Sequence, residues 1–196
     1  MIKFKDILEN KILVPRKLDT RKEDQKRVTL QKIQQYIKDG LKGDLDLSNT
    51  SITSLPDNLK TVGGSLDLEN TPITSLPSNL KTVGGNLYLG DTPITSLPDN
   101  LTVRGDLDLY NSKITSLPDN LTVGGYLSLN NTPIKSLPDN LTVGGFLSLS
   151  IAPITSLPSN LKVGGTLNLS NTPISEKYSE EEIRKMVPGV EGNIYL

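Results

Sequence analysis

Hydrophobic and polar residues alternate in short segments that recur through most of the chain. The pattern Gly-x-Leu-x-Leu returns every 20 or 21 residues, and its first leucine lies at Leu45, Leu66, Leu87, Leu107, Leu127, Leu147 and Leu167. Alternation of leucine with polar residues is typical of a short strand with one buried face. A repeat of this length predicts a solenoid, in which each unit stacks on its neighbours.

One unit illustrates what each turn contributes. Six of its side chains are expected to face inward: Leu127, Leu129, Ile134, Leu137, Leu141 and Val143. Each is worth roughly 1.5 to 3 kcal/mol when fully buried, but only stacked neighbours can bury them. Pro133 and Pro138 remove backbone donors and predict an extended or 3₁₀-like return path. The pair Gly144 and Gly145 predicts a tight turn into the next strand, which positive φ angles would allow.

Helical caps are predicted at both ends, because the terminal units of a solenoid would otherwise expose their core. Residues 1–42 are expected to form the N-terminal cap. Its first helix is short and amphipathic, with Phe4, Ile7, Leu8 and Ile12 on one face. Its second helix runs from Arg21 to Asp39, with Gly40 as the stop.

Residues 43–175 are predicted to form the solenoid of seven units, and residues 176–196 its C-terminal cap. Ser179 and Glu182 have the spacing of a capping box, which predicts a helix through about Met186. The last five residues repeat the Gly-x-Leu-x-Leu pattern in the form Gly-Asn-Ile-Tyr-Leu. They predict an eighth strand.

These units resemble the leucine-rich repeat family, and within it the bacterial LPX type found in secreted effectors of enteric pathogens. The resemblance covers residues 41 to about 174 and rests on the Leu-x-Leu strand followed by a Leu-Pro-x-x-Leu return. It implies a parallel β-sheet on the concave face of the solenoid. A right-handed β-helix is the alternative fold, because Val-Gly-Gly-x-Leu is one residue longer than the usual Leu-x-x-Leu spacing.

The ladder position of the family, usually Asn, differs in this chain. It is occupied by Thr50, Thr71, Thr92, Ser112, Thr132, Ala152 and Thr172. The sequence therefore predicts a hydroxyl ladder that satisfies backbone groups and is missing at Ala152. The apolar Ile151 beside it indicates either a lateral contact or sequence drift.

The polar positions that flank the strand leucines are expected to form three outward columns on the concave face. Five of the eight aromatic residues fall in these columns, namely Tyr88, Tyr110, Tyr126, Phe146 and Tyr195. Tyrosine is enriched at interface hot spots, so the pattern predicts a binding surface. The alternative is that aromatic residues simply suit exposed strands and pair across them.

Carboxylates occupy the first turns of the same columns. Asp46 and Asp67 would face each other, which costs stability unless a cation or a basic partner offsets the repulsion. The residues predicted to bind the partner are Tyr88, Tyr110, Tyr126, Phe146, Asp46, Asp67, Asp106 and Asp108. Two alternatives stay open: acidic residues that keep the surface soluble, and a calcium site, although no loop has the usual ligand order.

Composition excludes most catalytic chemistry. The 196 residues contain no His, no Cys and no Trp, which removes imidazole bases, thiolate nucleophiles and the common zinc ligands. We expect no enzyme, no metal and no cofactor. The secreted effectors of the family carry a ubiquitin-ligase domain with a catalytic Cys, and this chain has no residue to match it.

Charge is divided unequally, since residues 1–42 have a net charge of +6 and the remainder −7. This is too mild for a general nucleic-acid binder. No segment resembles a signal peptide or a membrane span. We therefore expect a protein-recognition module that binds a partner with a basic or mixed surface, in a bacterial cytoplasm or on a phage virion. A structural subunit of an assembly and an inhibitor of a host protein are the alternatives.

Overall fold

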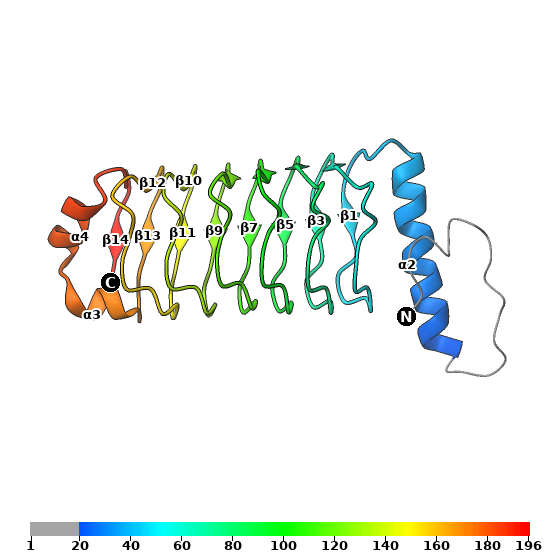
Figure 1. The fold of residues 1–196 in the computed structure, drawn as a ribbon, viewed down its shortest axis with the longest axis horizontal. Coiled ribbons are helices and arrows are strands. Elements are labelled where there is room, and N and C mark those ends of the chain that lie inside the picture. Colours follow the sequence, from blue (N-terminus) through cyan, green and yellow to red (C-terminus); the bar gives the residue numbers. More distant parts are fainter. Residues whose placement is uncertain (1–19) are drawn as a thin grey trace.

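The protein is a β-solenoid of stacked turns with helices at both ends, as seen in a computed structural model that describes residues 20–196 (Figure 1). The short amphipathic helix predicted around Phe4 to Ile12 lies outside the described residues. The turns form a row in Figure 1, with α2 at one end and α3 and α4 at the other. The prediction of a repeat solenoid is confirmed.

The Leu-x-Leu segments form one parallel sheet along the length of the solenoid. Its strands in spatial order are β1 (Leu45–Asp46), β3 (Leu66–Asp67), β5 (Leu87–Tyr88), β7 (Leu107–Asp108), β9 (Leu127–Ser128), β11 (Leu147–Ser148), β13 (Leu167–Asn168) and β14 (Ile194–Tyr195). Equivalent residues of successive units pair directly, so Leu45 lies opposite Leu66. The predicted eighth strand is confirmed, because Ile194 pairs with Leu167.

A second parallel sheet was not predicted. It consists of β12 (Lys162–Val163), β10 (Thr142–Val143), β8 (Thr122–Val123), β6 (Thr102–Val103), β4 (Thr82–Val83) and β2 (Thr61–Val62). Five of these strands are Thr-Val pairs and β12 is a Lys-Val pair. The β-branched residues suit a half-buried strand, and the valine of each pair is buried. Six turns therefore contain two strands each, which is the architecture of a β-solenoid.

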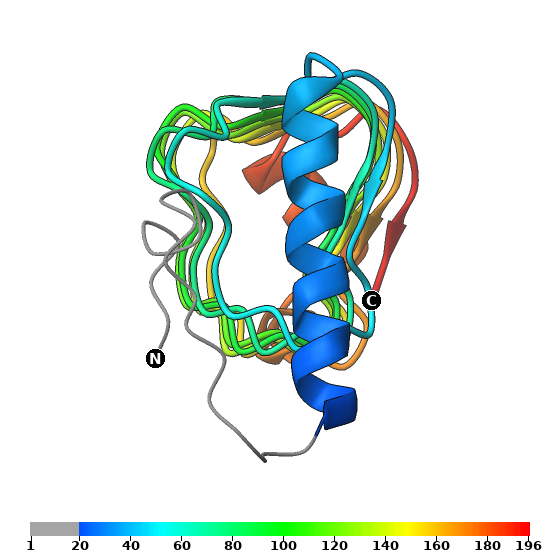
Figure 2. The ribbon, with the colours of Figure 1, turned by 90° about the vertical axis from the view of Figure 1, so that its right-hand side faces the viewer.

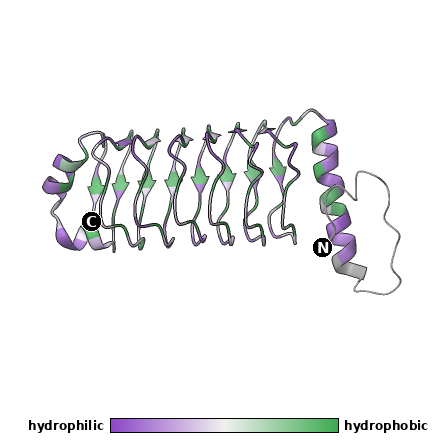
Figure 3. Ribbon diagram, viewed as in Figure 1, coloured by the Kyte–Doolittle hydropathy of each residue, from purple (hydrophilic) through white to green (hydrophobic). Residues whose placement is uncertain are grey.

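The predicted inward residues fill the interior of every turn. Leu127, Leu129, Ile134 and Leu141 have no exposed surface, and Val143 has 1%. Figure 3 shows a hydrophobic and a polar residue in many of the short strands, which is the alternation that places one face of each strand in the core.

From the second turn on, the glycines that precede each Leu-x-Leu strand are required by close approach of backbones. A Cβ on Gly85 would lie 2.8 Å from the Ser65 nitrogen and 2.9 Å from the Gly64 carbonyl carbon. Among the described glycines only Gly40 and Gly43 have positive φ. Among the repeat glycines, the expected positive φ is therefore found only at Gly43, before the first strand. It is wrong for the glycine pairs of the later turns, where the close approach of neighbouring turns excludes a side chain.

Helix α2 (Thr20–Lys38) lies across the first turn, in front of the stacked turns when the solenoid is viewed end on (Figure 2). Ile33 and Tyr36 are buried. The Tyr36 hydroxyl lies 2.9 Å from the Leu41 carbonyl oxygen and accepts a hydrogen bond from the Gly63 N–H at 3.1 Å. Burial raises the pKa of this phenol.

Two short helices follow the last Leu-x-Leu strand of the repeats. Helix α3 (Pro173–Lys177) begins three residues before the predicted start of the C-terminal cap, and α4 (Glu180–Met186) follows it. The predicted capping box is confirmed, since the Ser179 side chain accepts from the Glu182 N–H and the Glu182 carboxylate accepts from the Ser179 N–H. Ile183 of α4 is fully buried, so the helix covers apolar surface.

No helix within residues 20–196 is long and apolar enough to cross a bilayer.

Candidate functional site

The outward surface of the eight-stranded sheet holds the predicted binding residues, and we call it the strand face. It comprises three columns: the first column holds the residue before the first strand leucine of each unit, the central column the residue between the two leucines, and the third column the residue after the second leucine. Pairing in the sheet places Asp46 beside Asp67, Asp67 beside Tyr88, and Tyr88 beside Asp108. The central column of the strand face therefore runs in the predicted order.

The aspartates of the central column each accept a local hydrogen bond. The Oδ1 atom of Asp67 accepts from the Glu69 N–H at 3.0 Å, and that of Asp108 accepts from the Tyr110 N–H at 2.8 Å. Asp46 accepts from both the N–H and the hydroxyl of Ser48, at 3.0 and 2.8 Å. This arrangement holds each carboxylate in place and leaves its second oxygen at the surface.

Asp106 lies in the first column, as expected. Its Oδ1 accepts from the Tyr126 N–H on the next turn at 2.7 Å, a contact that the sequence did not indicate. Asp44 and Asn86 make equivalent bonds to the turns that follow them. These side chains satisfy backbone donors between turns, so Asp106 contributes to the fold whether or not it contacts a partner.

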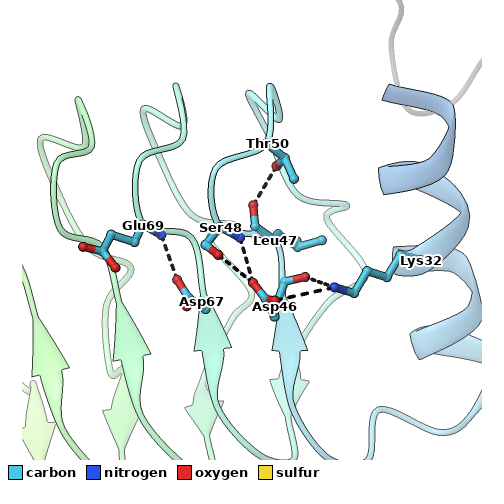
Figure 4. Close-up of polar contacts among 7 residues, drawn as sticks. All are labelled: Lys32, Asp46, Leu47, Ser48, Thr50, Asp67 and Glu69. Atoms are coloured by element: carbon cyan, nitrogen blue, oxygen red, sulfur yellow. Dashed lines mark hydrogen bonds and ion pairs between the residues drawn. The ribbon is translucent and has the colours of Figure 1, made fainter. Parts of the chain in front are cut away.

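Asp46 is already paired within the chain. The Lys32 ammonium, from α2, donates to the Asp46 carbonyl oxygen and lies 3.9 Å from Asp46 Oδ2 (Figure 4). The pKa of Asp46 is lowered by its hydrogen bonds from Ser48 and then by Lys32. The repulsion expected between Asp46 and Asp67 is thus offset by a lysine of the same chain. Sequence analysis missed Lys32, because nothing in the helix pattern relates it to the first strand.

Negative charge concentrates over the second to fourth turns. Desolvation, followed by the charges of Asp67, Asp108 and Asp91, raises the pKa of Glu69. The Glu69 side chain lies next to Gly90, whose added Cβ would be 3.7 Å from Glu69 Cγ. A cation placed here would relieve repulsion among the carboxylates.

The aromatic residues do not form one cluster. Tyr126 and Phe146 lie on neighbouring turns with ring centroids 5.3 Å apart and planes inclined at 50°. Tyr88 and Tyr110 lie on the acidic turns, where the Tyr88 hydroxyl accepts from Asn86 Nδ2 at 2.6 Å and Tyr110 is 46% exposed. The strand face therefore has an acidic part with two tyrosines and an uncharged part with a packed aromatic pair.

The predicted hydroxyl ladder forms bonds within each turn, not between turns. Thr71 Oγ1 donates to the Leu68 carbonyl at 2.7 Å, and Thr50, Thr92, Thr132 and Thr172 do the same in their units. Ser112 Oγ is buried, and within residues 20–196 it has no hydrogen-bond partner. Ala152 lacks the hydroxyl, as predicted.

Ile151 differs from the other residues of its column in chemistry but shares their backbone conformation. The equivalent residues Asn131 and Asn171 have φ of 56° and 58°, a left-handed conformation that Asn tolerates. Ile151 has φ of 63° and is 60% exposed. A β-branched residue in this conformation is strained, and no core contact compensates for it at this exposure.

A shallow, open hollow lies on the return path of the second and third units. It is lined by Ser75, Leu76, Ser78, Lys81, Ser96, Leu97, Pro98, Asp99 and Asn100. Within residues 20–196, no group of three or more acidic, His or Cys residues is placed to hold a metal ion. The strand face is thus the surface with the most distinctive chemistry.

No protein-family model and no curated protein matches the chain.

Proposed function

We propose that this protein is a non-enzymatic recognition module that binds a partner protein through the strand face. The observation that carries the proposal is the packed pair of Tyr126 and Phe146 on the outward side of the sheet. Aromatic residues that served only stability would be expected in the core, where the repeats use Leu, Ile and Val instead. Partly exposed aromatic rings on a rigid sheet supply contact area at low entropic cost.

The acidic turns beside this pair favour a partner with a basic or mixed surface. Asp67, Asp108 and Glu69 lie on the same face as Tyr88 and Tyr110, so a partner would meet charge and aromatic surface together. Complementary charge steers association and selects against acidic partners, nucleic acid included. We expect binding to weaken as salt is added.

We further infer that the solenoid is of the leucine-rich repeat type with helical caps. The Leu-x-Leu strands, the Leu-Pro return and the buried faces of α2 and α4 support this assignment. The six-stranded second sheet is also expected of a right-handed β-helix, which remains the alternative. Both folds present the strand face in the same way, so the proposed function does not depend on the choice.

Affinity capture with a matched pair of variants tests the proposal. The strand-face variant replaces four aromatic residues by serine, which the chain itself uses in the same three columns at Ser65, Ser128 and Ser150. Its substitutions are Tyr88→Ser, Tyr110→Ser, Tyr126→Ser and Phe146→Ser. Bait proteins are incubated with lysate of a bacterial host and with phage particles, and captured proteins are identified by mass spectrometry.

The control variant carries Asp57→Asn and Asp139→Asn on the exposed return path, away from the strand face. We expect a partner that wild type and control capture and the strand-face variant does not. Equal capture by all three would contradict the proposal and move the site to the caps or the return path. Incorporation into phage particles without a captured partner would favour a structural subunit, and a tight 1:1 complex that blocks a host enzyme would favour an inhibitor.

A further inference from the structure

The last strand of the eight-stranded sheet has an open edge. In a parallel pair of strands, one residue makes both hydrogen bonds to the neighbouring strand, and the residue opposite it faces away. The Leu167 N–H donates to the Asn193 carbonyl, so the main-chain N–H and C=O of Ile194, opposite Leu167, point away from the sheet. Arg184 of α4 donates to the Gly192 carbonyl at 3.1 Å and so covers only the approach to β14. Within residues 20–196, no strand pairs with the outer side of β14.

The other three sheet edges are bordered by segments of the same chain. At β1, Lys32 of α2 donates to the Asp46 carbonyl, which is free because β1 is an edge strand. At β12, Val163 forms a bridge with Val190. Residues 41–43 border the end of β2, since two of their carbonyls accept from the glycines that follow this strand. An uncovered strand edge is a site for association with another chain, which makes β14 the exception that needs a partner.

Both ends of the solenoid also expose large apolar side chains. Three of the five exposed large hydrophobic residues in the described part of the chain lie at its ends. Val28 of α2 is 60% exposed at one end, and Tyr195 and Leu196 are 53% and 42% exposed at the other (Figure 1). Val28 lies one helical turn before Lys32, which contacts β1, so it shares the side of α2 that is nearer the eight-stranded sheet. Copies stacked in line would therefore bring Val28 of one copy close to β14 of the next.

The two ends carry opposite charge. Residues 20–43 contain seven Lys+Arg and three Asp+Glu, a net charge of +4, whereas residues 173–196 contain three and five, a net charge of −2. Charge complementarity therefore favours contact between unlike ends and disfavours contact between like ends.

We propose that the N-terminal end of one copy, formed by α2, docks on the open edge of β14 at the C-terminal end of a second copy. Val28 would pack on Tyr195 and Leu196. Gln31, exposed three residues after Val28, carries both a donor and an acceptor for the free main-chain groups of Ile194. The two contacting surfaces differ, so the contact is heterologous and leaves a free end on each side for further copies. The strand face runs along the side of such a row, so this inference does not rest on the proposed function.

Sedimentation velocity of the 196-residue protein tests the self-association. We expect the mass to rise with protein concentration from 21.3 kDa through dimers to larger species, and added salt to weaken the association. Val28→Glu keeps a helix-forming residue at an exposed position and sets a negative charge against the acidic end, so we expect association about tenfold weaker. Tyr110→Glu is the matched control, since Tyr110 is 46% exposed on the strand face, and it should have no effect.

Cross-linking through introduced cysteines tests which ends meet, because the chain has no Cys of its own. A variant with Val28→Cys and Tyr195→Cys is treated with a flexible bis-maleimide. The two positions lie at opposite ends of the solenoid, so each cross-link joins different copies, and we expect a ladder of dimers, trimers and larger products (Figure 1). A mixture of the two single-cysteine variants should stop at dimers. The control with Val28→Cys and Tyr110→Cys should give no ladder.

Three outcomes would overturn the inference. One is a constant mass of 21.3 kDa at every concentration. Another is a dimer formed by either single-cysteine variant alone, which would mean that like ends meet. The third is an equal ladder from the two double-cysteine variants, which would place the contact elsewhere. None of these results affects the capture experiment on the aromatic residues of the strand face, so failure of the inference and failure of the proposed function are separate.

Discussion

The ring of Tyr126 packs against the ring of Phe146 on the neighbouring turn, with centroids 5.3 Å apart. Both residues precede the first strand leucine of their units and point out of the sheet, so the contact crosses from one turn to the next. Such inclined pairs contribute about 0.5 to 1.5 kcal/mol beyond the area that they bury. The pair therefore links neighbouring turns on the outside of the sheet and leaves part of its surface exposed for a partner.

The first prediction concerns the contribution of the Tyr126–Phe146 pair to the stability of the protein. We expect Tyr126→Ser and Phe146→Ser each to lower the free energy of unfolding by about 1 kcal/mol, with a coupling of about 0.5 kcal/mol between them in a double-mutant cycle. Urea denaturation followed by circular dichroism measures both. A coupling of zero would mean that the rings do not interact in solution.

The second prediction is that replacing glycine by alanine changes the stability of the protein in opposite directions at two positions of the repeat. A Cβ on Gly85 would approach backbone atoms of the preceding turn within 2.8 and 2.9 Å, whereas one on Gly90 meets nothing closer than 3.7 Å. We expect Gly85→Ala to cost about 1 to 3 kcal/mol of unfolding free energy. Gly90→Ala should be neutral or stabilise by up to about 1 kcal/mol, since its φ is not positive. Thermal unfolding of the two variants tests this difference. Similar melting temperatures would contradict the conclusion that close approach of neighbouring turns requires glycine at position 85.

The third prediction is that a substitution that relieves the backbone strain at Ile151 stabilises the protein. Ile151→Asn restores the residue type of the column at a φ of 63°, and we expect it to stabilise the protein by about 1 kcal/mol. The reverse change, Asn131→Ile, should destabilise it by a similar amount and also removes the bond from Asn131 Nδ2 to Asn111 Oδ1. Calorimetry of both variants gives the comparison. If Ile151→Asn were less stable than wild type, the exposed isoleucine would have a packing role that its exposure does not suggest.

The fourth prediction concerns pH and two carboxyls with opposite shifts. The folded-state pKa of Glu69 is raised, chiefly by desolvation, so its contribution to stability is present at low pH and is lost as pH rises through that pKa. The pKa of Asp46 is lowered by Ser48, so its contribution is present at neutral pH and is lost as pH falls through the folded pKa.

Substitution should therefore have opposite effects at the two sites. Because both side chains are largely exposed, we expect Glu69→Gln to stabilise by less than about 0.5 kcal/mol at about pH 7, and not at all at about pH 3. Asp46→Asn should destabilise slightly at the higher pH. Carbon-detected NMR titration of the carboxyls checks the directions independently, and a Glu69 pKa at or below that of an exposed glutamate would refute the assignment.

Much of the architecture follows from the repeat itself. The 20-residue period, the inward leucines and the capping box at Ser179 specify local conformation and burial, which depend on nearby residues and on a neighbour that is nearly identical. For that reason the register of the central column, from Asp46 to Tyr195, was predictable before the structure was known.

The second sheet was missed for a physical reason. A two-residue Thr-Val segment is too short for a periodic signal, and it becomes a strand only when the same segment of the next turn supplies its hydrogen-bond partners. The role of the glycine pairs could not be predicted for the same reason, because the close approach of Gly85 to Gly64 exists only between stacked turns.

Some features of the strand face were determined by the sequence, and others only by the tertiary structure. The chain itself determined which residues point outward, because alternation along a strand places them there. Only the tertiary structure decided that Asp106 bonds to the next turn and that Lys32 reaches Asp46. These contacts join residues 14 to 20 positions apart in sequence, and their geometry is set by how whole turns and helices pack.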